Sequence, residues 1–171
     1  MPNIAGNSPT AHGIFDGHTY PGILPGVSPN GNSVTLNQGA RIVLTAKDFS
    51  IAGDLGLNEG VSGNSAHISG GAFTASDFLD IFGGRSYYGN ATGNSVTLSG
   101  SPVFLAGSDV RLVGGDGTTG DLFTDNTLNV WEYSQGSSVI HTVKNFQYYN
   151  FVLPANLAYG STLLSANTIM G

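Results

Sequence analysis

Apolar and polar residues alternate in a six-residue phrase that occurs four times along the chain. It reads GNSVTL at residues 31–36 and again at 93–98, and the related phrases GNSAHI and DNTLNV occupy residues 63–68 and 125–130. The fourth and sixth positions are apolar in every copy and the fifth is polar, as in a β-strand with one buried face. We therefore predict a strand in each phrase, with its apolar positions directed inward. These positions are Val34, Ala66, Val96 and Leu128 in one row, and Leu36, Ile68, Leu98 and Val130 in a second.

The spacing of the phrases indicates a repeat protein. The copies start at residues 31, 63, 93 and 125, so 32, 30 and 32 residues separate them, and a period in this range is typical of solenoids. Residues 31–165 are therefore predicted to form a parallel β-solenoid. The spacing leaves open whether one repeat forms a single wide coil or more than one small coil. Each phrase is followed by a turn-rich break and a second apolar stretch, at residues 40–51, 72–82, 102–113 and 138–153.

An asparagine occupies the second position of every phrase, at the predicted corner before the strand. If the coils stack, these side chains lie above one another and can form a hydrogen-bonded ladder. Turn preference alone is the alternative explanation, because Asn tolerates left-handed backbone and bonds to nearby backbone groups. The sequence leaves both interpretations open. The four residues are Asn32, Asn64, Asn94 and Asn126.

The two ends of the chain differ from the repeats. Residues 1–30 hold five of the seven prolines and show no regular alternation. They are too apolar for a linker, and they are predicted to cap the first coil, which would otherwise expose an apolar face and open strand edges. A loosely ordered lead-in is the alternative, and residues 166–171 are predicted to be a C-terminal tail. Aromatic residues near the end of the repeats are predicted to close the last coil: Phe146, Tyr148, Tyr149 and Phe151.

Composition and charge support an all-β protein and exclude some partners. Only 9% of the residues are charged, and strong helix formers other than Ala and Leu are scarce between the many turn residues. The net charge of −6, with no basic stripe, argues against a nucleic-acid partner. The chain has no Cys, and no stretch of it reaches the length of a membrane span. Its first residues lack the basic and apolar regions of a signal peptide.

Three longer segments resemble the repeat-bearing passenger region of bacterial autotransporter proteins. They read IFGGRSYYGNATGNSVTLSGSPVF at 81–104, GDLFTDNTLNV at 120–130 and VKNFQYYNFVLPANLAYGSTLL at 143–164. The resemblance implies an all-β, right-handed parallel β-helix that is secreted or displayed on the surface of a Gram-negative cell. It also implies that the chain is a fragment, or is exported by other means, because the outer-membrane barrel of a full autotransporter is missing. The partner implied is a host-cell, bacterial or matrix ligand, either protein or glycan, and no cofactor is expected.

The residues that could carry chemistry form no coherent catalytic or metal site, and none is assigned. Asp77 and Asp80 could form the carboxylate pair of a glycoside hydrolase, but two acids three residues apart are more typical of a solvated strand edge. Asp116 and Asp121 lie in GGDGTTGDL, which departs at Thr119 from the calcium-binding nonapeptide. An ordinary acidic loop is therefore favoured over a calcium site.

The remaining candidates are histidines and the single tryptophan. His12 and His18 share the N-terminal segment with Asp16, which leaves a chance metal site as a minor alternative. His67 and His141 stand apart from them and show no metal-binding spacing. Trp131 is expected to cover the last coil, with a sugar-stacking platform as the alternative.

Two classes of function follow from these observations. The favoured class is a non-enzymatic adhesive or structural rod. The alternative is a carbohydrate-active β-helix such as a polysaccharide lyase, a hydrolase or a tail-spike-like protein. Acidic residues recurring on one outward face would favour the enzyme, but the aligned outward residues are not acidic. They are Thr35, His67, Thr97 and Asn129.

Overall fold

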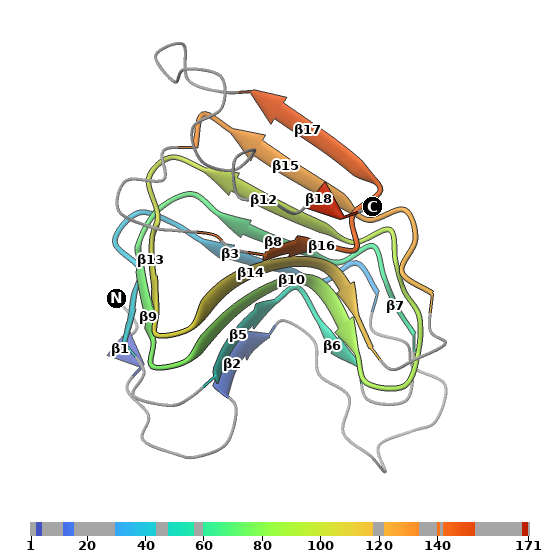
Figure 1. Cartoon of the computed structure of the whole chain (residues 1–171), viewed down its shortest axis with the longest axis horizontal. Helices are drawn as coiled ribbons and strands as arrows, with labels where there is room; N and C mark the ends of the chain where they lie inside the picture. Colours follow the sequence, from blue (N-terminus) through green and yellow to red (C-terminus); the bar gives the residue numbers. More distant parts are fainter. Residues whose placement is uncertain are drawn as a thin grey trace.

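The computed structural model is an all-β solenoid (Figure 1). The residues that it describes are 3–4, 12–15, 30–43, 48–56, 60–117, 122–133, 140, 142–152 and 169–170. Among them there is no helix, and every strand pairing is parallel. The predicted parallel β-helix is therefore confirmed.

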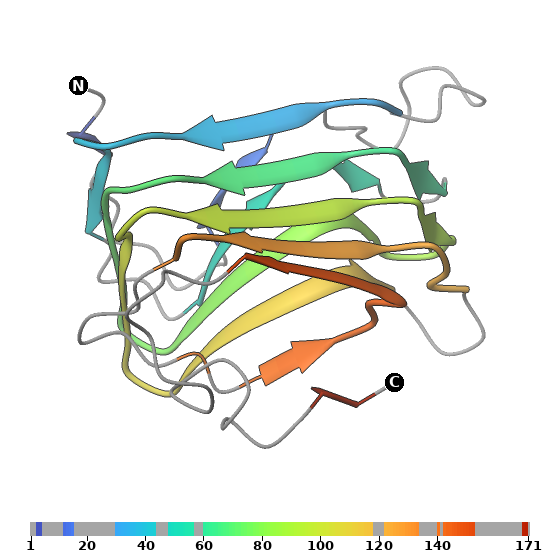
Figure 2. The ribbon, with the colours of Figure 1, turned by 90° about the horizontal axis from the view of Figure 1, so that it is seen from above.

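The four phrases lie side by side in one sheet, which we call the first sheet (Figure 2). Its Cα register pairs Val34 with Ala66, Ala66 with Val96, and Val96 with Leu128, as the sequence alignment predicts. One repeat is thus one wide coil, which answers the question that the spacing left open. In order along the stack, the strands are β3 (Ser33–Leu36), β8 (Ser65–Ile68), β12 (Ser95–Ser99), β15 (Thr127–Trp131) and β17 (Tyr148–Val152).

Two further sheets complete the coils, and a short strand pair precedes the first sheet. The second sheet contains β1 (Asn3–Ile4), β4 (Arg41–Val43), β9 (Ala72–Ala75) and β13 (Val103–Ala106). The third contains β2 (His12–Phe15), β5 (Asp48–Ala52), β6 (Leu55–Gly56), β10 (Phe78–Ser86), β14 (Asp109–Asp116), β16 (Thr142–Lys144) and β18 (Ile169–Met170). The short pair is β7 (Val61–Ser62) and β11 (Ala91–Thr92).

The interior of the coils is apolar because the alternating residues of all three sheets point into it. Ala66, Val96 and Leu128 are fully buried, and Val34, near the start of the stack, is 7% exposed. Aromatic residues also stack between coils: the rings of Phe73 and Phe104 are 5.6 Å apart. Burying one such side chain contributes about 1.5–3 kcal/mol, so the stacked rows are the main source of stability.

The chain ends take part in the sheets. β1 pairs with β4, and β2 pairs with β5, so the described parts of residues 1–30 extend two sheets by one strand each. The rest of the predicted cap lies outside the described residues. At the other end, β18 from the predicted tail pairs with β16.

The last coil is shorter than the others. Tyr148 of β17 pairs with Thr127 of β15, and the equivalent residues Asn129 and Asn150 are 21 positions apart. Phe146 is buried in the interior, and the ring of Tyr149 meets it edge-on at 6.2 Å. Phe146 thus lies in the core and Tyr149 packs against it, whereas Tyr148 is exposed. The side chain of Phe151 lies outside the described residues.

Candidate functional site

A ladder of asparagine side chains fixes the corner before the first sheet. The side-chain carbonyl of Asn64 accepts from the backbone N–H of Asn32 at 2.8 Å, and Asn94 accepts from Asn64 in the same way at 3.0 Å. Asn126 continues the ladder from Asn94, and Gln147 takes the next place after the short last coil. The ladder therefore forms, but most of its donors are backbone N–H groups rather than side-chain amides. The sequence alignment missed Gln147 because the last coil breaks the repeat length.

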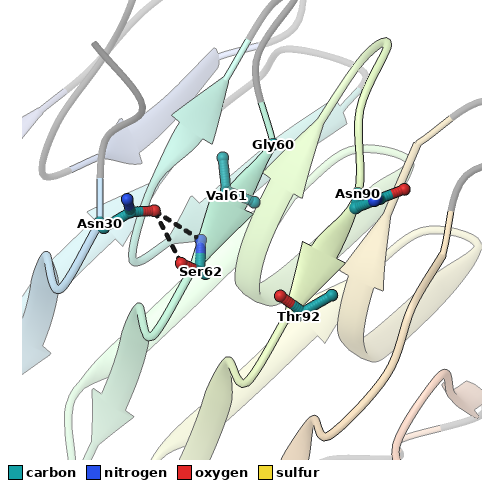
Figure 3. A pocket seen from close by; sticks show the side chains of 6 residues that line it. All are labelled: Asn30, Gly60, Val61, Ser62, Asn90 and Thr92. Atoms are coloured by element: carbon teal, nitrogen blue, oxygen red, sulfur yellow. Dashed lines mark hydrogen bonds between the residues drawn. The ribbon is translucent and has the colours of Figure 1, made fainter. Parts of the chain in front are cut away.

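A shallow groove of about 230 Å³ lies beside this corner (Figure 3). Asn30 holds one side of it: its side-chain carbonyl accepts from the backbone N–H of Ser62 at 3.0 Å and from the Ser62 hydroxyl at 2.8 Å. Asn90 lines the other side, and its side-chain carbonyl accepts from the backbone N–H of Leu122 at 2.9 Å. The lining is uncharged and consists of Asn30, Gly60, Val61, Ser62, Asn90 and Thr92.

The outer face of the first sheet presents polar side chains in register. In its central row the amide of Asn129 donates to the Thr97 hydroxyl at 3.2 Å, and the amide of Asn150 donates to the Asn129 carbonyl at 2.9 Å. His67 lies in the same row, with its Nε2 atom 3.4 Å from the Ser99 hydroxyl. Parallel register thus gives a flat face of small amide and hydroxyl groups. Its central row is Thr35, His67, Thr97, Asn129 and Asn150.

The outer face of the third sheet carries a group of charged side chains that includes Asp80, Arg85, Arg111 and Asp116. Asp80 on β10 binds Arg111 on β14 through both carboxylate oxygens, at 2.5 and 2.7 Å. The guanidinium of Arg111 also lies 4.2 Å from the centre of the Phe78 ring. β10 and β14 are strongly bent (Figure 1), and the outward side chains near the bend are buried: Asp80 is 5% exposed and Phe82 is 2% exposed. The bend therefore forms a second, smaller buried cluster outside the main core.

The two partners of this ion pair differ in how burial affects them. Burial raises the pKa of the Asp80 carboxyl, although the hydrogen bond and the charge of Arg111 lower it. Burial lowers the pKa of Arg111, but the hydrogen bond and the charge of Asp80, together with the charges of Asp109 and Asp116, outweigh it, and the net pKa of Arg111 is raised. The Asp80 side chain is 8% exposed and that of Arg111 is 31% exposed. Loss of hydration therefore sets the direction of the pKa shift at the Asp80 carboxyl, whereas nearby carboxylates set it at the Arg111 guanidinium.

The acidic residues predicted as alternatives have partners in neighbouring coils. Asp77 accepts a hydrogen bond from the Ser108 hydroxyl, while Asp80 is held by Arg111. The two carboxylates are thus bound to different side chains of the next coil, as structural contacts would be.

Asp116, the described half of the calcium alternative, lies between two cationic groups. Its carboxylate oxygens are 3.4 Å from Arg85 Nε and 3.7 Å from Lys144 Nζ. Asp121 lies outside the described residues, as do His18, His141, Asp16 and the side chain of His12. Within the described part of the chain no group of three or more His, Cys, Asp or Glu residues is placed to hold a metal ion.

Trp131 does not cover the interior, so that expectation is wrong. Its side chain is 50% exposed and lies on the outer face of the first sheet, because Val130 before it points inward. The alternation of β15 could have indicated this, since Trp131 follows the outward Thr127 and Asn129 at intervals of two.

Among the described residues, no helical segment has the length and apolar character that crossing a membrane requires. The chain matches no protein-family model, no curated protein and no solved structure.

Proposed function

We propose that this chain is a passenger fragment of a bacterial autotransporter, secreted or displayed at the cell surface, and that it acts by contact as an adhesive rod. The observation that carries the proposal is the registered array of polar side chains on the outer face of the first sheet. The resemblance of segments 81–104, 120–130 and 143–164 to autotransporter passengers supports the cellular setting.

The coil geometry suits adhesion through many weak contacts. Neighbouring strands lie about 4.8 Å apart, and the ladder from Asn32 to Gln147 holds the coils at that spacing. Ordering the contact groups before binding lowers the entropy lost on association. When many copies are displayed on one surface, modest contacts combine through multivalency.

Adhesion of coated beads tests the proposal. Beads carrying the full chain at high and low density are added to epithelial cells, bacterial cells and matrix-coated wells, and retained beads are counted after washing. We expect strong retention at high density, little at low density, and weak binding by the soluble chain. Beads coated with heat-unfolded chain are the control.

Two results would contradict the proposal. Equal retention of beads coated with folded and with unfolded chain would show that adhesion does not depend on the coil geometry. Release of reducing or unsaturated sugar from a polysaccharide panel, abolished in Asp77→Asn or Asp80→Asn, would favour the carbohydrate-active alternative.

A further inference from the structure

Two large aromatic side chains are exposed on the outer face of the first sheet. Trp131 at the end of β15 is 50% exposed, and Tyr148 at the start of β17 is 55% exposed. Tyr148 pairs with Thr127, so Trp131 lies four residues further along the adjacent strand. At about 3.3 Å per residue and about 4.8 Å between strands, their Cα atoms are about 14 Å apart. Each ring therefore offers an apolar surface to a ligand that lies along this face.

Two amide side chains, those of Asn129 and Asn150, lie on this face between Trp131 and Tyr148. Asn129 lies between Thr127 and Trp131 on β15, and Asn150 is its partner on β17. The Asn150 amide donates to the Asn129 carbonyl at 2.9 Å, and the Asn129 amide donates to Thr97 at 3.2 Å. These contacts hold the amides in place while leaving further donor and acceptor positions open, since each amide can form several hydrogen bonds.

The charges near this face argue for an uncharged ligand. The described Lys and Arg residues lie on other sheets: Arg41 on the second, and Arg85, Arg111 and Lys144 on the third. The two acidic residues at the ends of β15 are Asp125, whose carboxylate is 3.4 Å from the Tyr148 hydroxyl, and Glu132, which follows Trp131. Carboxylates repel anionic ligands and accept hydrogen bonds from hydroxyl groups.

We infer that this face binds an uncharged polysaccharide, with Trp131 and Tyr148 stacking on separate sugar rings of one glycan chain. Sugar rings have C–H-rich faces that pack on aromatic rings, and rims of hydroxyls that need both donors and acceptors. Asn129 and Asn150 supply those groups between the two rings. The inference rests on the proposed adhesive function and names the ligand class and the residues for it.

Binding of the full chain to defined polysaccharides tests the inference. Insoluble cellulose and chitin, and soluble mannan and dextran, are the uncharged probes, and heparin and alginate are the anionic ones. Trp131 is the only tryptophan in the chain, so its fluorescence reports on this face alone. We expect at least one uncharged polysaccharide to bind, to shift the emission to shorter wavelength and to protect it from acrylamide quenching.

Substitutions on the face provide the second readout. Trp131→Ala and Tyr148→Ala are each expected to weaken binding about threefold to tenfold, the range of one aromatic stacking contact. Tyr88→Ala is the matched control, because Tyr88 is 65% exposed but lies between β10 and β11, away from this face. Unchanged thermal melts of the three variants would show that the coils remain folded.

The results separate this inference from the proposed function. The inference would be overturned if every uncharged probe failed to bind, if heparin or alginate bound better, or if Trp131→Ala and Tyr148→Ala bound as tightly as the parent. If densely coated beads of those two variants still adhere to cells as the parent does, the adhesive function stands and the assignment of this face falls. If parent beads adhere to no surface, the adhesive function itself falls.

Discussion

The side-chain carbonyl of Asn126 accepts a hydrogen bond from the backbone N–H of Asn94 at 2.9 Å, although 32 residues separate them. The side-chain amide of Asn94 also donates to this carbonyl at 3.2 Å, and both residues are fully buried. A buried backbone N–H has to be paired in a folded protein. The asparagine of one coil thus provides the acceptor that the corner of the previous coil needs.

Asn94→Ala is expected to destabilise the fold. It removes the acceptor for the backbone N–H of Asn64 and the donor to Asn126, and each buried group left unpaired costs about 1–3 kcal/mol. Urea unfolding should show a loss of at least about 2 kcal/mol. Asn129→Ala is the control, because it breaks similar inter-coil bonds on the partly exposed outer face and should cost less than about 1 kcal/mol. Equal losses for the two variants would argue against a special role of the buried ladder.

Leu98→Asp is expected to disrupt the interior. Leu98 is fully buried and pairs in register with Ile68 and Val130, so an aspartate there would place an unpaired carboxylate between apolar rows at a cost of several kcal/mol. Coupling between adjacent coils should spread the damage. Thr97→Asp, one residue earlier and directed outward, should change stability by no more than about 0.5 kcal/mol. Thermal melts of the two variants measure the contrast, and a parent-like melt of Leu98→Asp would exclude the inward position.

Two glycines with similar backbone should respond differently to asparagine. Gly93 and Gly100 have φ values of 64° and 63°, a left-handed conformation that Asn and Asp tolerate better than other residues with a side chain. Asp125 already occupies the corner equivalent to Gly93, with φ of 59°. A Cβ atom at Gly93 meets nothing closer than 3.9 Å, whereas one at Gly100 would overlap the carbonyl oxygen of Ser69.

Gly93→Asn should therefore be tolerated, while Gly100→Asn should cost about 1–3 kcal/mol more because the neighbouring coil has to shift. Chemical denaturation of both variants against the parent measures the difference. Similar losses at the two positions would mean that backbone conformation, and not the approach of the adjacent coil, determines the need for glycine.

Tyr133→Phe is expected to leave stability unchanged or raise it by about 1 kcal/mol. Tyr133 is 3% exposed, and its hydroxyl has no hydrogen-bond partner among the described residues. Burial raises its pKa well above the ordinary value, which is about 10 in the unfolded chain. The unfolded state therefore loses this proton first, and the parent should lose stability as the pH rises above about 10. Melting temperatures at pH 8 to pH 11 should fall less steeply in Tyr133→Phe; parallel curves would contradict this.

Arg111→Met is expected to destabilise the chain at neutral pH and much less in acid. It leaves the buried Asp80 carboxylate without its partner, at a cost of about 2 kcal/mol, less than for a fully buried pair because Arg111 is partly exposed. The pKa of Asp80 is already raised by burial. The folded state therefore binds the Asp80 proton more tightly than the unfolded chain, in which the carboxyl has a pKa of about 3.9. This contribution to stability is complete below that pH and is lost as the pH rises through the pKa of Asp80 in the folded state.

Denaturation of Arg111→Met at pH 7 and near pH 4 measures this dependence. The double variant Asp80→Leu with Arg111→Met should recover most of the loss at pH 7, since no charge is then buried alone. If the stability lost in Arg111→Met were the same at both pH values, the loss would come from the packing of Arg111 on Phe78 and not from the unpaired carboxylate.

The repeated phrase by itself determined the period, the strand in each repeat and the inward rows that include Val96 and Leu98. These features are local: side chains alternate along any extended strand, and a phrase that recurs at about 30 residues has to bury the same positions each time. The corner asparagines were also visible in the sequence. Whether they form a ladder was not, because that depends on how closely one coil lies above the next.

Tertiary structure alone decided the features that depend on contacts between coils. The pairing of Asp80 with Arg111 joins residues 31 positions apart, and no local pattern marks them as partners. The burial of Asp80 comes from the bend in the third sheet, which encloses outward side chains that alternation assigns to solvent. Gln147 continues the ladder because the last coil is only 21 residues long. In each case the position of a side chain is set by the stacking of distant segments, which the local sequence does not encode.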